Sequence, residues 1–235
     1  MTARTGIFVF SMSCFLLGGC DFDRIATGPE KDDPVSIDAG TADRADMELD
    51  MGAGQMNISG GAAKLVQGTF EYNVDAWKPL VNSSINGSHA AVTIKQPSGV
   101  HGAGKTHYVW NLQLNDKILT DLALNCGAGQ AKLDLGSLLL RSLQVHMGAG
   151  QVQLDLSGQP RHDYDVKIEG GVGQADIQLP QGAGIWVEAH GGIGSINVSG
   201  LEKHGDHWEN DQYNKAKVSV KVAVHGGIGE IKIRS

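Results

Sequence analysis

Glycine recurs at a nearly fixed spacing through most of this chain, and that spacing constrains the fold more than any other feature. Six segments share a G-x-G pattern: MGAGQMNI at Met51, CGAGQAKL at Cys126, MGAGQVQL at Met147, GGVGQADI at Gly170, GGIGSINV at Gly191 and GGIGEIKI at Gly226. From Gly127 onward, the first glycine of the pattern recurs after 21, 23, 21 and 35 residues. Such a repeat predicts stacked units, because a unit this short cannot bury its own apolar face.

Apolar and polar residues alternate inside each unit, which is the pattern of a β-strand. In the unit around Met147, one face runs as far as Ala149, and the alternation resumes in a new phase at Val152. The change of phase falls at Gly150, and glycine lets a strand turn a corner. Each unit is therefore expected to be a strand that bends at its glycines.

Stacked units would place equivalent residues above one another, about 4.8 Å apart. Two columns are apolar in every unit and are predicted to face the core: Ala53, Ala128, Ala149, Val172, Ile193 and Ile228 inside the G-x-G, and Ile58, Leu133, Leu154, Ile177, Val198 and Ile233 five residues later. The residue before each member of the second column is polar and is predicted to face outward. This sorting favours an all-β fold, a β-solenoid. A β-sandwich is the alternative, because alternation alone does not decide whether strands pair parallel or antiparallel.

The regular repeat occupies residues 119–235, whereas residues 47–118 fit it less well and are predicted to form an N-terminal cap or enlarged rungs. Within that part, residues 85–88 have the composition of a hairpin turn. At the other end, the last strand carries Glu230, Lys232 and Arg234. These charges are predicted to lie on an open edge and to discourage further stacking.

The first twenty residues, MTARTGIFVFSMSCFLLGGC, indicate a secreted protein. Residues 1–19 are predicted to be a signal peptide, because Arg4 precedes an apolar run from Ile7 to Leu17 that ends in small residues. The run is shorter than the roughly 20 residues that a spanning helix needs. The stretch from Leu17 to Cys20 resembles the lipobox of bacterial lipoproteins, which implies that Cys20 is acylated. The alternative is an ordinary signal peptide with an incidental cysteine. Cys126 then remains alone, so no disulfide is expected, and its register places it in the core.

Residues 20–46 are acidic, interrupted by proline and poor in apolar side chains, a composition that predicts a disordered tether behind the lipidated Cys20. Residues 21–50 hold ten acidic and three basic side chains, which accounts for the net charge of −7 of the whole chain. The remainder is close to balance and offers no basic face to nucleic acid. The expected partners are the cell membrane, through the lipid anchor, and an envelope protein or glycan on the extracytoplasmic side.

Several stretches resemble a known family. They are Met47-Glu-Leu-Asp-Met-Gly-Ala-Gly-Gln, Leu65-Val-Gln-Gly-Thr-Phe-Glu-Tyr, Trp110-Asn-Leu-Gln-Leu, the two Gly-Ala-Gly-Gln units that end in Leu-Asp-Leu, and Ile177-Gln178-Leu179-Pro180. Together they resemble the toast-rack domain of bacterial envelope proteins, which is similar to the C-terminal β-domain of LiaF-like cell-wall-active antibiotic response proteins and to adhesin head domains. The resemblance covers Asp46 to Ser235. It implies a right-handed β-helix-like solenoid and a role in envelope stress sensing or surface interaction, and it carries over no catalytic residue.

A candidate metal site lies in the outward column two residues before each leading glycine, which reads Asp50, Asn125, His146, Glu169, His190 and His225. If the units stack in sequence order, His146, Glu169 and His190 occupy three consecutive rungs. Two imidazoles around a carboxylate suit a transition metal. The alternative is that these are solvated polar residues at strand ends. A second polar cluster, His204, Asp206, His207 and Glu209, lies in the insertion before the last repeat.

Residues 99–106 match the G-x-x-x-x-G-K-[ST] loop that binds nucleotide phosphates, but the alternating residues from Tyr108 predict a strand where such a loop needs a helix. No nucleotide and no cofactor is therefore predicted. These observations favour a non-enzymatic, lipid-anchored envelope protein that presents a face or an open edge to another envelope component. One alternative is a structural adhesin-like module. The other is a carbohydrate-active β-helix enzyme that uses Asp134 and Asp155, adjacent carboxylates on an outward column.

Overall fold

The computed structural model describes residues 24–99, 101–103 and 105–235, and the only helix among them is the 3-10 helix η1 (Asp75–Trp77). The strands are β1 (Arg24–Ala26), β2 (Lys31–Ile37), β3 (Arg44–Ser59), β4 (Val66–Tyr72), β5 (Leu80–Asn86), β6 (His89–Lys95), β7 (His101–Ala103), β8 (Tyr108–Leu114), β9 (Leu119–Asp134), β10 (Leu140–Asp155), β11 (Tyr164–Gln178), β12 (Gly184–Ser199), β13 (Glu202–His204), β14 (His207–Glu209) and β15 (Ser219–Arg234). The prediction of an all-β fold is confirmed.

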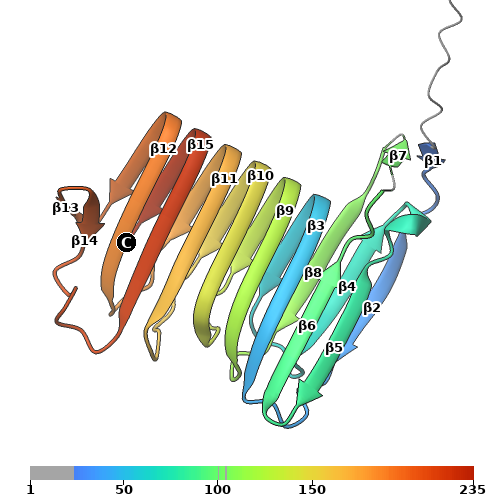
Figure 1. Ribbon diagram of the computed structural model, residues 1–235, viewed down its shortest axis with the longest axis horizontal. Helices are drawn as coiled ribbons and strands as arrows, with labels where there is room; N and C mark the ends of the chain where they lie inside the picture. Colours follow the sequence, from blue (N-terminus) through green and yellow to red (C-terminus); the bar gives the residue numbers. More distant parts are fainter. Residues whose placement is uncertain (1–23, 100, 104) are drawn as a thin grey trace, which may run out of the picture.

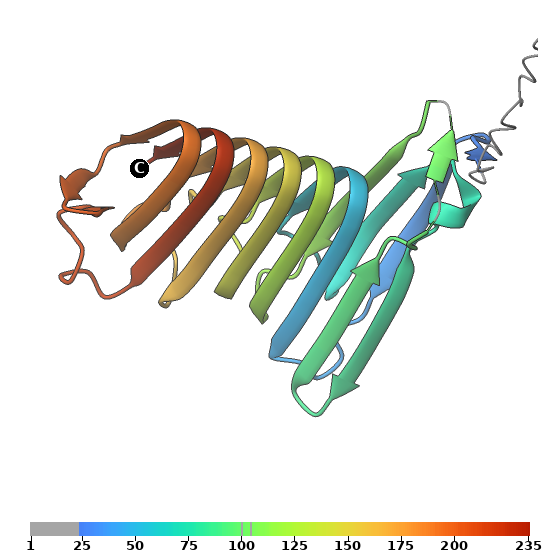
Figure 2. The same ribbon diagram turned by 45° about the horizontal axis from the view of Figure 1, so that its top comes forward.

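Six long strands, β3, β9, β10, β11, β12 and β15, form the body of the molecule (Figure 1). Each has 15 or 16 residues and bends back at its G-x-G, so that the strands stack as nested arches (Figure 2). They pair in parallel, and Gly150 lies opposite Gly129 on one side and Gly173 on the other. Each strand contributes one arm to each of two facing layers, with the core between them. This is the predicted β-solenoid, since a β-sandwich would build its two layers from separate strands.

The bend needs glycine for a steric reason. The second glycine of the pattern has a positive φ, 138° at Gly150, and this backbone conformation is rare for residues with a side chain. A Cβ at Gly150 would also lie 1.9 Å from the carbonyl oxygen of Gly129 on the neighbouring strand. The same clash, at 1.7 to 1.9 Å, would occur at Gly129, Gly173, Gly194 and Gly229. Adjacent strands can therefore approach this closely at the bend only because neither carries a Cβ there.

The core lies between the two arms, and its predicted second column is confirmed. Ile58, Leu133, Leu154, Ile177 and Ile233 are buried, and Val198, on the outermost long strand, is partly buried. The other predicted core column is wrong. The residues inside the G-x-G face solvent, with exposed fractions of 53% at Val172, 71% at Ile193 and 51% at Ile228. The prediction assumed a straight strand, but the chain turns a corner here, which puts the middle residue on its outer side.

The bends are filled in one half of the stack and hollow in the other. The last inward residue before the G-x-G is Met51 in β3, Cys126 in β9 and Met147 in β10, whereas β11, β15 and β12 have Gly170, Gly226 and Gly191. A Cβ at Gly170 would meet no atom within 4 Å. A cavity of about 100 Å³ lies under these three bends. In the same rungs a large apolar side chain stands outside the bend instead.

Cys126 lies in the core, as its register predicts. Its side chain is 4% exposed, and burial raises the pKa of the thiol to about 11. The thiol is therefore protonated at neutral pH, and a protonated thiol is a poor nucleophile. We assign it a packing role.

The last strand of the chain is not the last strand of the stack. β15 pairs with β11 on one side and with β12 on the other, so that the order is β3, β9, β10, β11, β15, β12 (Figure 1). The chain leaves β11, skips one position to form β12, and returns through residues 200–218 to fill the position it skipped. The prediction that Glu230, Lys232 and Arg234 lie on an open edge is therefore wrong. Arg234 instead forms an ion pair of 2.7 Å with Asp176 of β11.

The N-terminal part extends both layers with shorter strands. β8, β4 and β2 continue the layer of the second arms, and β6 and β5 continue the layer of the first arms. β5 and β6 are antiparallel, with Asn86 opposite His89. The hairpin turn predicted at residues 85–88 is confirmed, although β5 continues through the first two of these residues.

The acidic residues before the repeat are structured, so the prediction of a disordered tether over residues 20–46 is wrong for the described part. β2 pairs antiparallel with β4, and β3 already begins inside this range. Val35 and Ile37 of β2 are buried. Asp32 points outward, whereas Asp33 lies on the same face as Val35, nearer the start of the strand, and is partly buried. Asp33 accepts a hydrogen bond of 2.5 Å from the Tyr72 hydroxyl, which lowers the pKa of Asp33. Composition predicted disorder because the abundant acids obscured a short alternation.

The signal peptide predicted for residues 1–19 and the lipidation predicted at Cys20 lie outside the described residues. Within the described residues, no helix has the length and apolar character needed to cross a membrane.

Candidate functional site

Histidines gather on the outer surface at the C-terminal end of the stack. Of nine histidines in the chain, four lie on β12, β15 and the β13–β14 hairpin: His190, His225, His204 and His207. Together with Glu188 we call them the histidine face. β14 pairs with the first arm of β12 and places His207 opposite Glu188, and β13 places His204 opposite His207. Strand pairing thus assembles residues that are scattered along the sequence.

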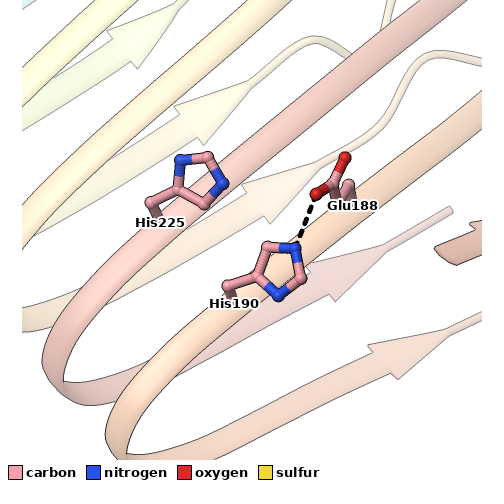
Figure 3. A group of neighbouring side chains, drawn as sticks. All are labelled: Glu188, His190 and His225. Atoms are coloured by element: carbon pink, nitrogen blue, oxygen red, sulfur yellow. Dashed lines mark hydrogen bonds and ion pairs between the residues drawn. The ribbon is translucent and has the colours of Figure 1, made fainter. Parts of the chain in front are cut away.

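Glu188, His190 and His225 form the centre of the histidine face (Figure 3). His190 lies opposite His225 on the neighbouring strand, and their rings stack with centroids 5.4 Å apart and 21° between their planes. Glu188 precedes His190 by two residues and therefore lies on the same side of β12. Its Oε1 is 2.6 Å from Nε2 of His190. One oxygen or ring nitrogen from each residue lies within 4.8 Å of the other two, and both imidazoles are exposed.

The β13–β14 hairpin brings the second predicted cluster beside this centre. The ring of His207 stacks on the rings of Trp186 and His204, with 5.4 Å and 6.2 Å between the ring centroids. Asp206 lies 3.1 Å from Nδ1 of His207, and this contact is the main cause of the lowered pKa of Asp206. The cluster predicted in the insertion is thus real as a grouping, and it adjoins β12.

The predicted run of His146, Glu169 and His190 on consecutive rungs is wrong, although all three lie in one column. β15 lies between β11 and β12 and therefore places His225 between Glu169 and His190. His146 contacts Glu169, with 2.8 Å between Nδ1 and Oε2. The ammonium of Lys167 is closer still, at 2.6 Å, and is the main cause of the lowered pKa of Glu169. His146 and Glu169 thus form a pair apart from His190.

The sequence analysis did not group His225 and Glu188 with His190, for two different reasons. His225 belonged to the predicted column, but its place in the stack depends on the strand order. The final 35-residue step was the available signal, because an insertion of that length lets the chain cross back over a strand. Glu188 could have been found from the period of two, which places residues 188 and 190 on one face of a strand.

Asp134 and Asp155, the candidate pair for glycan cleavage, lie opposite each other on β9 and β10. They line a broad groove on the outer surface of the second arms, whose other polar side chains include Asn57, Asn111, Lys132 and Arg234. Asp155 accepts a hydrogen bond of 2.7 Å from the amide of Ser157. No aromatic ring is among the described residues that line this groove. It therefore offers polar contacts to a ligand but no stacking platform for a sugar ring.

The loop that matches a phosphate-binding pattern leads directly into strand β8, as the alternation predicts. A phosphate cradle of that class relies on the amides of a following helix. The described residues around Lys105 supply no such helix.

The second arm of β12 forms a free edge at the C-terminal end. The β13–β14 hairpin covers β12 only at Trp186–Glu188, and no described strand pairs with the outer side of residues 191–199. This segment, GGIGSINVS, contains no charged side chain. Ile193, within this segment, lies on the outer side of the bend, in line with Ile228 of β15 and Val172 of β11. We call residues 191–199 the β12 edge.

Two protein families match this chain. The N-terminal domain of toast_rack matches residues 26–178, and the C-terminal domain of LiaF, a cell wall-active antibiotics response family, matches residues 128–233. A comparison with curated proteins finds no significant match.

A solved structure supports the fold. A candidate cell adhesion protein from Clostridium sporogenes is 35% identical, with a TM-score of 0.84 over 88% of this chain and 99% of that one. A candidate adhesin from Bacteroides fragilis is 9% identical, with a TM-score of 0.34 over 89% of this chain and 99% of that one. The second score is too low to support any inference. The toast-rack model covers more than half of the sequence, and the first structure is similar over nearly all of the fold. This chain belongs to the toast-rack family.

Proposed function

We propose that this protein is a lipid-anchored, non-enzymatic interaction module of the bacterial cell envelope, and that it binds an extended segment of another envelope protein along the β12 edge. Family membership supports the envelope setting, because the matching LiaF domain is named for a cell wall-active antibiotics response and the similar Clostridium protein for cell adhesion. The β12 edge is the observation that carries the binding mode. An unpaired strand offers a row of backbone donors and acceptors to an incoming strand.

The other edges of the stack differ from the β12 edge. On the side of the second arms, the N-terminal edge is β2, which carries Pro34 together with Lys31, Asp32 and Asp33. Proline and charges on an edge strand prevent pairing with other chains. On the side of the first arms, the C-terminal edge is covered by the β13–β14 hairpin. β5, at the far end of the molecule, is also an uncharged edge and exposes Leu80, Val81 and Ile85, but it is a straight hairpin strand with no row of apolar residues at strand bends beside it. The β12 edge therefore combines an uncharged strand with the apolar residues outside the bends.

Charge on the β12 edge is expected to abolish partner binding. A photo-crosslinking residue at Asn197 should capture one discrete protein in cells, and adding Ser195→Lys should remove that product, because a lysine on the edge disfavours strand addition. The crosslinker at Gln153 is the matched control: it occupies the same outward column on β10, which has a strand on each side. A product that forms equally from both positions, or that survives Ser195→Lys, would contradict the proposal. A product of twice the chain mass would identify a second copy instead.

The lipid anchor is tested separately. Cys20→Ser is expected to release the protein from the membrane fraction, because acyl chains on Cys20 would be the attachment and each buried methylene contributes about 0.8 kcal/mol. Cys14→Ser is the control, since Cys14 lies within the predicted signal peptide and should leave the protein membrane-bound. Fractionation and labelling with a fatty-acid analogue measure both. Membrane retention or labelling of the Cys20→Ser protein would rule out this anchor.

A further inference from the structure

We propose that Glu188, His190 and His225 bind a divalent transition-metal ion, with zinc as the representative, on the outer surface of β12 and β15. The placement of the three side chains carries this proposal. Parallel pairing fixes His190 beside His225, and the period of two brings Glu188 to the same face. The proposal does not depend on the partner at the β12 edge.

The donor set selects the class of metal. Imidazole nitrogen is a preferred donor for zinc, copper and nickel, and one carboxylate beside two imidazoles is compatible with all three. Calcium and magnesium instead require six or more oxygen donors, counting water. Three protein donors leave the remaining coordination positions to solvent, as the exposure of both imidazoles allows.

The geometry requires only side-chain movement. In a tetrahedral zinc site with bonds of about 2.0–2.2 Å, donor atoms lie about 3.3 Å apart. Here the three donor atoms lie within 4.8 Å of one another. His190 and His225 have exposed rings that can rotate about their side-chain bonds, and the paired strands hold their backbones in place. The ion would replace the present contact between Glu188 and His190. The loss of that contact would be compensated, because both groups would then bind the same cation.

A metal ion at this site would also link β12 to β15, two strands that differ in how many neighbouring strands they have. β15 has a strand on each side, whereas β12 is the last long strand and has the free edge. An ion held by both would resist separation of β12 from β15. Because the donors come together only in the folded chain, binding is expected to raise the melting temperature. At free zinc about 100-fold above the dissociation constant, the increase should be about 5–10 °C.

Zinc titration of the full-length protein without a histidine tag tests the site. Calorimetry at pH 7.5 should give one zinc per chain, and His190→Ala and His225→Ala should each weaken binding at least about tenfold. Glu188→Gln should weaken it as well, and magnesium should give no heat. The controls are His89→Ala and His146→Ala, which remove imidazoles paired with Asp46 at 3.0 Å and Glu169 at 2.8 Å. Both should bind zinc as the wild type does.

The outcomes separate clearly. Circular dichroism first tests whether each variant is folded. We expect that all of them are, because the substituted side chains lie on the surface. Unchanged zinc affinity in folded His190→Ala and His225→Ala proteins would overturn the proposal. So would a loss of binding confined to His146→Ala, because it would place the ion between β10 and β11. A zinc-dependent rise in melting temperature that persists in His225→Ala would likewise exclude this site.

Discussion

Replacing Gly150 with alanine is expected to destabilise the fold by about 3–5 kcal/mol. The new Cβ would lie 1.9 Å from the carbonyl oxygen of Gly129, and the residue would have to keep a φ of 138°. Local relaxation is blocked, because Gly150 is paired with β9 on one side and with β11 on the other. Native proteins are stable by about 5–15 kcal/mol, so this single methyl group would remove a large part of the total.

Gly170→Ala is the matched control, one rung further along the stack. The same methyl group would meet no atom within 4 Å, and it would point into the hollow of the bend. Its effect should lie between none and a gain of about 1 kcal/mol, because alanine reduces the freedom of the unfolded chain. Thermal unfolding followed by circular dichroism should place Gly150→Ala about 10 °C below the wild type and Gly170→Ala at or above it. Equal melting temperatures would refute the steric account of the bend.

Ending the chain after Val218 is expected to prevent the C-terminal half from folding, although only 17 residues are removed. The missing strand, β15, supplies five buried side chains, Val220, Val222, Val224, Ile231 and Ile233. At about 1.5–3 kcal/mol for each buried side chain, the loss approaches the whole stability of a typical domain. β12 would also lose the strand with which its entire length is paired.

A longer deletion should do less harm. Ending the chain after Pro180 removes 55 residues, including β12, the hairpin and β15, but leaves each remaining long strand with its neighbours in sequence order. Limited proteolysis and thermal unfolding should show a more resistant core in this protein than in the one that ends after Val218. If the shorter deletion is instead as resistant as the full chain, β12 has moved onto β11, and the observed strand order is not required for folding.

The sequence predicted the strands well because their signals are local. Glycine spacing located every bend, and alternation located both arms, since each depends on residues only a few positions apart. The order of the last two strands could not be predicted in this way. The units of β12 and β15 carry nearly the same apolar pattern, so either order would fill the same columns. The choice rests on contacts between residues far apart in the chain.

Two local predictions failed because they extended a rule beyond its range. Alternation placed Val172 and Ile193 inside, but strict alternation holds only for a straight strand. Composition predicted that residues 20–46 form a disordered tether, but net charge says little about a strand whose acidic and apolar residues can take opposite faces, as Asp32 and Val35 do. In the candidate site the histidine column was correct, but the neighbour of His190 was misassigned because of the strand order, and Glu188 was missed although it lies two residues before His190 on the same face.

The interlocked end has a consequence for how such a stack can change in length over evolution. A copy of the last unit, duplicated and joined after Ser235, would find both sides of β15 already paired, by β11 and by β12. Units copied in the region of β9 and β10 would meet no such obstacle, because there the strands follow one another in sequence order. The number of rungs in related proteins is therefore expected to vary in the middle of the array, with the final crossed pair retained as a terminator.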